Sequence, residues 1–222
     1  MAATEEAVPV SMTLASLDHV PDHPLPPGFS FRMFRPGDEQ TWTDIWVKAE
    51  KYLKITTATF TAEFGSDASL LAQRQFFLLN GGGQPVGTAT AWLTDKGYAP
   101  DAARVHWVAI VPEMQGRGLS RPLLSAVLKR MKELGYRGSF LGTHSARTAA
   151  VKLYLEFGFV PEVRNDRERQ AWREVRQRIA PSVLDRLIQL HGHPAHASQG
   201  RLAPARAIYL SGCGTRCPER IA

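Results

Sequence analysis

Residues 108–121 read Val108-Ala-Ile-Val-Pro-Glu-Met-Gln-Gly-Arg-Gly-Leu-Ser-Arg121, and this stretch decides the fold. Its apolar, β-branched start is typical of the end of a buried strand. Pro122 has no N–H and fits only in the first turn of a helix, which predicts a helix that begins near Gly118. The residues between them, Gln115–Ser120, then form a turn. The sequence thus predicts a strand, a turn and a helix in direct succession.

The predicted turn has the residue types that suit an anion at the start of a helix. Backbone N–H groups at a helix N-terminus are unpaired and carry a partial positive charge from the aligned peptide dipoles. Diphosphate oxygens are suitable acceptors for them. Gly116 and Gly118 let an anion approach the backbone and can take positive φ. Arg117 and Arg121 add full charges. We predict an anion site here, with a plain loop before a core helix as the alternative.

Two common nucleotide-binding motifs do not describe this turn. The chain contains no Gly-x-x-x-x-Gly-Lys-[Ser/Thr], which excludes a nucleoside-triphosphate loop. Arg121 stands where a dinucleotide fingerprint has glycine or alanine, which argues against that fingerprint as well.

Hydrophobic periodicity predicts a mixed sheet with helices. The order is an antiparallel hairpin followed by strand, helix, strand, helix and strand, which is typical of an α/β fold with a mixed α+β sheet. The expected strands are Phe29–Arg35, Gln75–Leu79, Val86–Leu93, Arg104–Val111, Gly138–Thr143 and one from Gly158; the expected helices start at Asp38 as a cap and near Gly118, and cover Ala146–Phe157. The first helix has Trp42, Ile45, Trp46, Ala49 and Leu53 on one apolar face.

Composition and the positions of proline, glycine and charged residues divide the chain into four parts. Residues 1–28 contain five prolines without periodicity and are expected to be a mobile leader. Residues 29–165 form the folded domain, 166–190 a charged helical extension with a solvated surface, and 191–222 a weakly ordered tail.

Charge and composition exclude several classes of protein. Hydrophobic residues make up 44% and charged residues 22%, as in globular proteins. No apolar run reaches the roughly 20 residues that span a bilayer, and the N-terminus lacks a secretion signal, so we expect a cytoplasmic protein that does not enter membranes. Residues 162–222 hold eleven Lys and Arg against six Asp and Glu, which accounts for nearly all of the net +6 charge. The main body therefore argues against nucleic acid as a partner.

Histidines and cysteines near the C-terminal end do not form a recognisable metal site. The spacing of these residues matches no standard zinc site, and we expect no metal; they are His191, His193, His196, Cys213 and Cys217.

A second motif follows the turn by about 30 residues, with Leu153-Tyr154 and Gly158-Phe159. With it, the chain resembles the GCN5-related N-acetyltransferase (GNAT) superfamily over about Phe29 to Glu162. The signature of that superfamily, Gln/Arg-x-x-Gly-x-Gly/Ala, corresponds to Gln115-Gly-Arg-Gly118-Leu-Ser120. Ser120 stands where the superfamily prefers Gly or Ala, and Arg147 where many members have Asn.

The resemblance implies acetyl-CoA as co-substrate and direct attack of an amine on the thioester in a ternary complex. It places coenzyme A in a gap where two parallel strands splay, here Arg104–Val111 and Gly138–Thr143. The implied coenzyme contacts are backbone N–H groups of Val108, Ala109 and Ile110 for the pantetheine and acetyl carbonyl, the turn residues Gln115, Gly116, Arg117, Gly118, Leu119, Ser120 and Arg121 for the diphosphate, and Arg147 near the pantetheine arm.

Two candidate catalytic residues follow from the resemblance. Tyr154 would protonate the departing thiolate, since a phenol has a pKa of about 10; a core tyrosine is the alternative. His106 is the candidate base, because strand alternation predicts that it shares a face with Val108, and its place nine residues before Gln115 is similar to that of a histidine implicated in arylalkylamine N-acetyltransferases. A structural histidine is the alternative. His144 is a weaker candidate, and Glu156 is expected to lie outside the site.

The sequence therefore predicts an acetyl-CoA-dependent N-acetyltransferase that acts on a primary amine of a small molecule or peptide. A catalytically silent module that binds acyl-CoA is the alternative, and a nucleic-acid-associated protein is a third reading. The first helix and the loop Lys54–Leu70 are expected to shape the acceptor pocket. Trp42 and Trp46 on that helix belong either to the core or to the lining of this pocket. Whether the chain forms a homodimer is left open.

Overall fold

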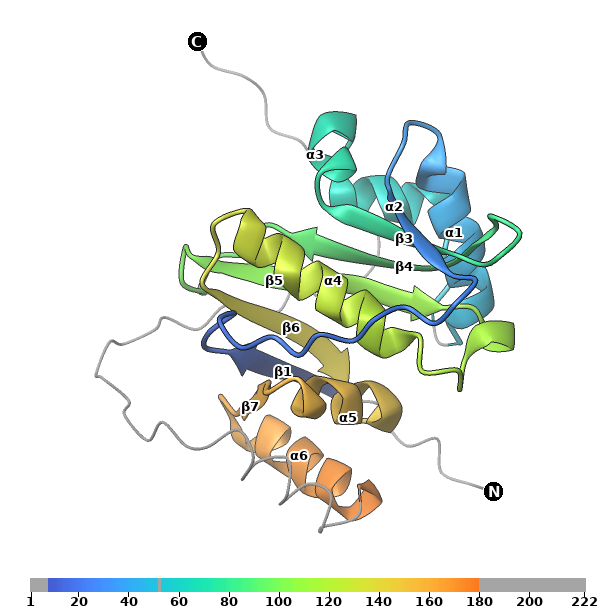
Figure 1. The fold of residues 1–222 in the computed structure, drawn as a ribbon. Coiled ribbons are helices and arrows are strands. Elements are labelled where there is room, and N and C mark those ends of the chain that lie inside the picture. Colours follow the sequence, from blue (N-terminus) through green and yellow to red (C-terminus); the bar gives the residue numbers. More distant parts are fainter. Residues whose placement is uncertain (1–7, 52, 180–222) are drawn as a thin grey trace, which may run out of the picture.

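The computed structural model describes residues 8–51 and 53–179, which form one seven-stranded sheet with helices on both faces (Figure 1). The strand order is β2-β3-β4-β5-β6-β1-β7, and every described pair is antiparallel except β5–β6. The strands are β1 (Pro9–Leu14), β2 (Ser30–Met33), β3 (Gln75–Leu79), β4 (Pro85–Trp92), β5 (Ala102–Ile110), β6 (Gly138–His144) and β7 (Val160–Glu162). The helices are α1 (Asp38–Ala49), α2 (Thr57–Phe64), α3 (Ala68–Ala72), α4 (Ser120–Glu133), α5 (Thr148–Glu156) and α6 (Asp166–Arg178), with a 3-10 turn at Pro112–Met114. The predicted mixed α/β sheet is confirmed.

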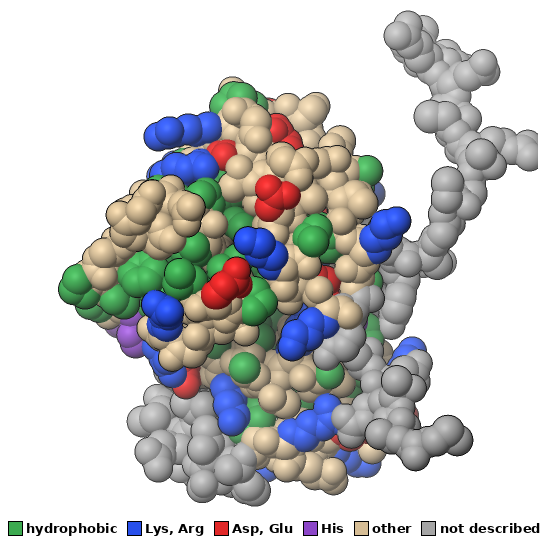
Figure 2. Space-filling model, turned by 90° about the vertical axis from the view of Figure 1, so that its right-hand side faces the viewer, with side chains coloured by type: hydrophobic (Ala, Val, Ile, Leu, Met, Phe, Trp, Pro, Cys, Tyr) green, Lys and Arg blue, Asp and Glu red, His purple; other side chains and the backbone are tan. Residues whose placement is uncertain are grey.

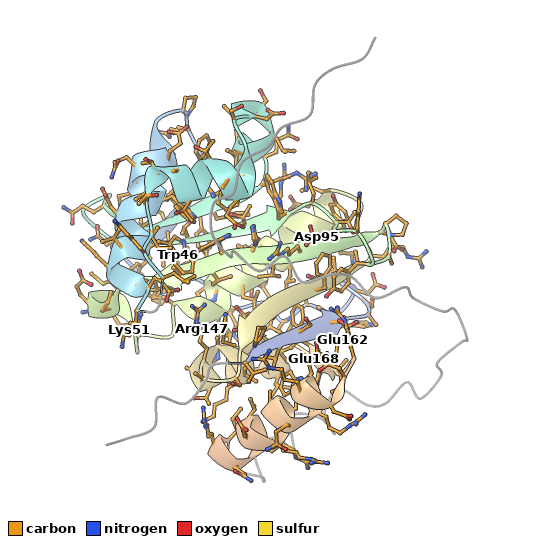
Figure 3. All side chains as sticks on the ribbon, turned by 180° about the vertical axis from the view of Figure 1, so that it is seen from behind. Trp46, Lys51, Asp95, Arg147, Glu162 and Glu168 are labelled. Carbon is orange, nitrogen blue, oxygen red and sulfur yellow. The ribbon has the colours of Figure 1, made fainter. Side chains whose placement is uncertain are left out.

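Two hydrophobic cores lie on opposite faces of the sheet. One packs α4, α5 and α6 against the strands, and Leu124, Tyr154 and Trp172 belong to it. The other lies under α1 and α2 and is rich in aromatic rings, with Trp42 and Phe60 almost fully buried. Viewed from behind, α1 and α2 cover one half of the sheet, and no described helix crosses β6 and β1 on this face (Figure 3). The second face is therefore only partly covered.

The strand β1 overturns the expectation that residues 1–28 are a mobile leader. Pro9–Leu14 pairs with β6 on one side and β7 on the other, so that it lies inside the sheet. Val10 and Met12 are buried in the core. Pro9 is the first residue of the strand, a position that proline tolerates. The strand is only six residues long and its partners lie more than 120 residues away in the chain, so a local pattern did not reveal it.

The chain between β1 and β2 is also tied to the domain. It crosses the face that carries α4 (Figure 1), where the Ser125 hydroxyl donates to the carbonyl of Pro21 at 2.7 Å. The same hydroxyl oxygen accepts from the backbone N–H of His23 at 3.3 Å. Leu17 is buried in the core. The folded domain therefore includes residues ahead of position 29.

Several predicted boundaries move for local reasons. The helix α4 begins at Ser120, close to the predicted start and with Pro122 in its first turn, because Gly116 and Gly118 both have a φ of 75° and cannot belong to a helix. Asp38 does not cap α1 but is its first residue, and its carboxylate accepts from the guanidinium of Arg32. The helix ends at Ala49, so Leu53 lies beyond it and is half exposed.

The segment predicted as the loop Lys54–Leu70 contains α2 and the start of α3. A reciprocal pair of hydrogen bonds between Thr56 and Thr59 caps the start of α2. Phe60 and Phe64 on α2 are buried, and this packing, rather than a motif, makes the segment helical.

The charged extension is an amphipathic helix and not a fully solvated one. Asn165 caps α6 by accepting from the N–H of Glu168, and Ala171, Trp172 and Val175 are buried in the first core. The predicted tail, its five candidate zinc ligands and the end of the predicted extension lie outside the described residues. Within the described part of the chain, no helix combines the length and the apolar character needed to cross a bilayer.

Candidate active site

The two parallel strands at the centre of the sheet separate, as the resemblance predicted. The strands β5 and β6 pair only from Ala102 to Arg104, opposite Gly138 to Phe140. Both strands continue beyond that point without pairing to each other, and Figure 1 shows them diverging. Gly142 on β6 is exposed, and a Cβ added there would meet nothing within 4 Å. Gly142 therefore lies on an uncovered part of β6, next to the point where the two strands separate.

A β-bulge in β5 sets the direction of the side chains beside this opening. The register against β4 shifts between Thr88 and Thr90, and Trp107 has a φ of 50°. The bulge breaks the alternation of side chains, so that His106 and Trp107 both contact α2. Val108 packs on the opposite core. The prediction that His106 and Val108 share a face is therefore wrong, because it assumed a regular strand.

The turn before α4 presents unpaired backbone donors. Gly116 and Gly118 are exposed, and the space where a Cβ would stand is empty at both. The backbone N–H groups of residues 116–120 donate to no described residue. Leu119 anchors the turn in the aromatic core, and the Gln115 side chain donates to the Ile110 carbonyl at 2.8 Å. The turn can therefore bind an anion without losing a hydrogen bond of its own.

The two arginines of the turn differ in their surroundings. Arg117 is exposed and forms no ion pair within the described part of the chain. Arg121 donates from Nε and Nη2 to the two carboxylate oxygens of Glu156, each at 2.9 Å. Glu156, expected outside the site, therefore balances the charge of Arg121 at the start of α4. Lys and Arg outnumber Asp and Glu on the end of the molecule shown in Figure 2.

Tyr154 lies on α5 in the core that also contains α4. It is 7% exposed, its ring packs edge-on against Phe159, and its hydroxyl donates to no described residue. Burial raises the pKa of Tyr154 to about 12, while the charge of Arg147 opposes the rise. The phenol therefore stays protonated at neutral pH and is available as a proton donor.

Arg147 is held by a carboxylate from the other side of the domain. Its Nη2 lies 2.6 Å from Oε2 of Glu50, whose side chain is 2% exposed. Glu50 directly follows α1 as its C-cap, and Arg147 directly precedes α5 as its N-cap. Figure 3 shows Arg147 near the end of α1, where Lys51 and Trp46 are labelled. The ion pair therefore joins helices from the two faces of the sheet.

His106 has a partner that the sequence did not indicate. Its Nε2 lies 3.1 Å from Oε2 of Glu63, and the Trp107 Nε1 donates to the same oxygen at 3.0 Å. Burial lowers the pKa of His106 to about 4, although Glu63 opposes the shift. The imidazole is therefore neutral at physiological pH and donates to Glu63. A pKa near the ordinary histidine value of 6.5, which would suit a general base, is therefore not found at His106. His144, the weaker candidate, is the last residue of β6, in register with Pro9.

A family model described as "Acetyltransferase (GNAT) family" matches residues 38–159, more than half of the chain. The chain belongs to the GNAT family of acetyltransferases. The match includes β5, the turn before α4, and α5, which are the parts that build the opening.

Curated relatives agree with the family. The chain is 31% identical over 169 residues to a mycothiol acetyltransferase of Pseudarthrobacter chlorophenolicus, which covers 71% of this chain and 50% of the relative. It is 33% identical over 162 residues to a mycothiol acetyltransferase of Paenarthrobacter aurescens, which covers 66% and 47%. The chain thus spans about half the length of the curated relatives that it matches.

Solved structures share the fold at low identity. A GCN5-related N-acetyltransferase from Sphaerobacter thermophilus superposes with a TM-score of 0.56 at 22% identity, over 70% of this chain and 50% of that one. A tandem GNAT protein from the clavulanic acid biosynthesis pathway superposes with a TM-score of 0.51 at 16% identity, over 71% and 51%. These likenesses support the GNAT fold.

Some residues of the candidate site were predicted from the sequence and others were not. The turn and Tyr154 were predicted through local motifs. Glu63, Glu50 and Gly142 were not, since none of them belongs to a motif and Glu63 lies in a segment predicted as loop. No signal in a single sequence distinguishes these residues from surface positions.

Proposed function

We propose that this GNAT domain transfers the acetyl group of acetyl-CoA to a primary amine. The observation that carries the proposal is the opening between β5 and β6, which ends next to a turn with free backbone donors. An opening in a sheet leaves strand N–H groups unpaired, and a long, thin substrate with a carbonyl and a diphosphate matches both sets of donors.

The diphosphate end of acetyl-CoA would bind at the turn. Residues 116–120 would donate their N–H groups, Gln115 would orient the turn, and Arg117 would add an unpaired charge. Arg121 and Arg147 would contribute only after their carboxylate partners rearrange, since each is already ion-paired. We therefore expect the backbone and Arg117 to supply most of the affinity at this end.

The acetyl end would lie along β5 beyond Arg104. The backbone N–H groups of Val108 and Ile110 are the nearest candidates to polarise the thioester carbonyl, because β6 no longer pairs with this part of β5. The N–H of Ala109 points toward β4 instead, as that of Val111 does when it donates to the Val86 carbonyl. Donors fixed where negative charge develops lower the barrier without further reorganisation.

The reaction would be a direct transfer in a ternary complex. The ammonium group releases one proton to solvent, and the neutral nitrogen attacks the carbonyl carbon. The N–C bond forms, the C–S bond breaks, and its electron pair passes to sulfur. Tyr154 donates its phenolic proton to the sulfur and regains one from the nitrogen of the intermediate. The products are the amide, the free thiol and one proton in solvent.

The acceptor is proposed from the relatives. Those described above are named for mycothiol, so a mycothiol-type amine is the first acceptor to test. The test is a turnover assay that measures thiol release from acetyl-CoA with mycothiol-type, aliphatic, aromatic and peptide amines. Amide formation that depends on the amine supports the proposal. Acetyl-CoA binding without any transfer would indicate a silent binding module instead.

A further inference from the structure

Glu63 stands out as a carboxylate held over the start of the opening. It lies on α2, and it contacts β5 at His106, two residues beyond the last pairing between β5 and β6. Its side chain is 22% exposed. Within the described chain, both hydrogen bonds to Glu63 reach Oε2, which leaves Oε1 without a donor.

One of the two residues that donate to Glu63 has a strained backbone. Trp107 adopts a positive φ, a strained conformation for a bulky residue, and the same bulge brings its indole N–H to Glu63. His106 is 4% exposed, between the rings of Phe64 and Trp92. Backbone strain of this kind persists only where the surrounding structure holds the residue in place. Here the strained conformation of Trp107 helps to fix the direction of the Glu63 carboxylate.

The negative charge of Glu63 is not neutralised by its neighbours. Both donors are uncharged, since His106 is neutral and an indole carries no charge. Hydrogen bonding from His106 lowers the pKa of Glu63, so the carboxylate is ionised at neutral pH. The charge of Arg104 also lowers the pKa of Glu63, but this guanidinium is ion-paired with Asp95 at 3.1 Å. Within the part of the chain that the structure describes, Glu63 therefore has two fixed donors and forms no ion pair with a lysine or arginine.

The surroundings of Glu63 suit an organic cation. The rings of Trp46 and Trp107 meet edge to face with centroids 4.6 Å apart, and Trp107 is half-buried. Aromatic rings beside a carboxylate favour an ammonium group with an apolar substituent. Gly142 lies on the adjacent strand, exposed and with open space above it, and Figure 3 shows this face of β6 free of described helices.

We propose that Glu63 binds the ammonium group of the acceptor on the α1–α2 face of the opening, with His106 and Trp107 as positioning residues. This inference rests on the proposed function and assigns its acceptor class: a monocationic primary amine without a neighbouring carboxylate. A carboxylate next to the amine would lie beside Glu63 and be repelled. Tyr154 packs in the opposite core, so the acceptor and the proton donor would approach the opening from different faces.

The test measures amine binding separately from acetyl transfer. The full chain, saturated with coenzyme A, is titrated by calorimetry with n-butylamine, cyclohexylamine and 2-phenylethylamine. The neutral 2-phenylethanol and the zwitterionic phenylalanine serve as paired ligands. We expect the amines to bind, and both paired ligands to bind at least tenfold more weakly than 2-phenylethylamine. No binding of any of the three amines, or equal binding of amine and alcohol, would overturn the inference.

Two variants test whether Glu63 is the residue that binds the amine. Glu63→Gln should weaken amine binding roughly 10- to 100-fold and leave coenzyme A affinity unchanged. The matched control is Glu133→Gln, at a carboxylate 63% exposed at the far end of α4, which should change neither. Equal amine affinity in Glu63→Gln and wild type would contradict the proposed contact.

A second pair of variants tests whether Trp107 and His106 position Glu63 for amine binding. Trp107→Phe keeps a ring but removes the N–H and should weaken amine binding about fivefold, while His106→Gln retains a donor and should stay within about twofold of wild type. Unchanged amine affinity in Trp107→Phe would remove the positioning role. Amine binding through Glu63 without acetyl transfer would support this inference and contradict the proposed function. Acetyl transfer with an acceptor KM that Glu63→Gln leaves unchanged would support the proposed function and contradict this inference.

Discussion

Arg147 and Glu50 form a 2.6 Å ion pair that joins the end of α1 to the start of α5. The two residues are 97 positions apart in the chain, and the Glu50 side chain is 2% exposed while that of Arg147 is 33% exposed. A buried carboxylate left without its cation is costly, so this pair holds the two helices at a fixed separation across the sheet.

Removing the carboxylate tests what Arg147 does for acetyl-CoA. Glu50→Gln should destabilise the domain by about 1–2 kcal/mol, a modest cost because the arginine can turn to solvent. It should also leave acetyl-CoA binding unchanged or tighter, whereas Arg147→Ala should weaken it about fivefold. Urea unfolding and calorimetry measure the two effects. Equal coenzyme affinity in Arg147→Ala and wild type would remove Arg147 from the binding site.

The turn before α4 can be tested with a matched pair of glycines. Gly118 and Gly135 both have positive φ with nothing within 4 Å of an added Cβ, but only Gly118 lies in the proposed diphosphate site. Valine at either position should cost roughly 1–3 kcal/mol of stability through backbone strain. Gly118→Val should also abolish acetyl-CoA binding, measured by calorimetry, and Gly135→Val should not. Normal binding in Gly118→Val would refute the assignment of the turn.

Tyr154→Phe removes the proposed proton donor and leaves the ring. We expect turnover to fall about 100-fold while acetyl-CoA affinity stays within about twofold of wild type. Tyr136→Phe, at a half-buried tyrosine beyond the end of α4, is the control and should keep the full rate. Since the pKa of Tyr154 is raised to about 12, ionisation of this phenol should not reduce the rate below about pH 11. An unchanged rate in Tyr154→Phe would exclude the assigned acid.

Burial of neutral His106 makes the fold sensitive to acid. Its folded-state pKa of about 4 lies below the ordinary value of 6.5, so the folded state binds fewer protons than the unfolded state in this window. Its contribution is complete above about pH 6.5 and is lost as the pH falls toward 4, by about 3 kcal/mol in total. His106→Gln should lose correspondingly less stability than wild type between pH 7 and pH 4 in urea unfolding. Parallel losses in the two proteins would show that His106 is not the group that titrates.

The position of β1 predicts that the N-terminal residues are needed for folding. Met12→Ala should cost about 2–5 kcal/mol, because the side chain is fully buried between α6 and the sheet. Val160→Ala on the edge strand β7, where the valine is 46% exposed, should cost less than about 0.5 kcal/mol. Deletion of residues 1–14 should abolish cooperative thermal unfolding. A deleted protein that still unfolds cooperatively would contradict the structural role of β1.

Part of the structure could be predicted from the sequence, because it depends only on residues that lie close together in the chain. The glycines at 116 and 118 and the proline at 122 restrict their own backbone, and the apolar spacing of the following helix needs no distant partner. The motif around Tyr154 lies within seven consecutive residues. These features together were enough to predict the mixed sheet, the separated strands and the family.

Only the tertiary structure decided the features that depend on distant residues. The strand β1 is defined by pairing with β6 and β7, and its own six residues resemble an irregular leader. The direction of His106 depends on a bulge against β4, which no period-2 pattern predicts. Glu63 acquires its two donors from β5, 43 and 44 positions away in the chain. The sequence by itself determined the glycine-rich turn in which we predict an anion site, because that turn depends on neighbouring backbone atoms. The proposed place of the amine depends on contacts that exist only after folding.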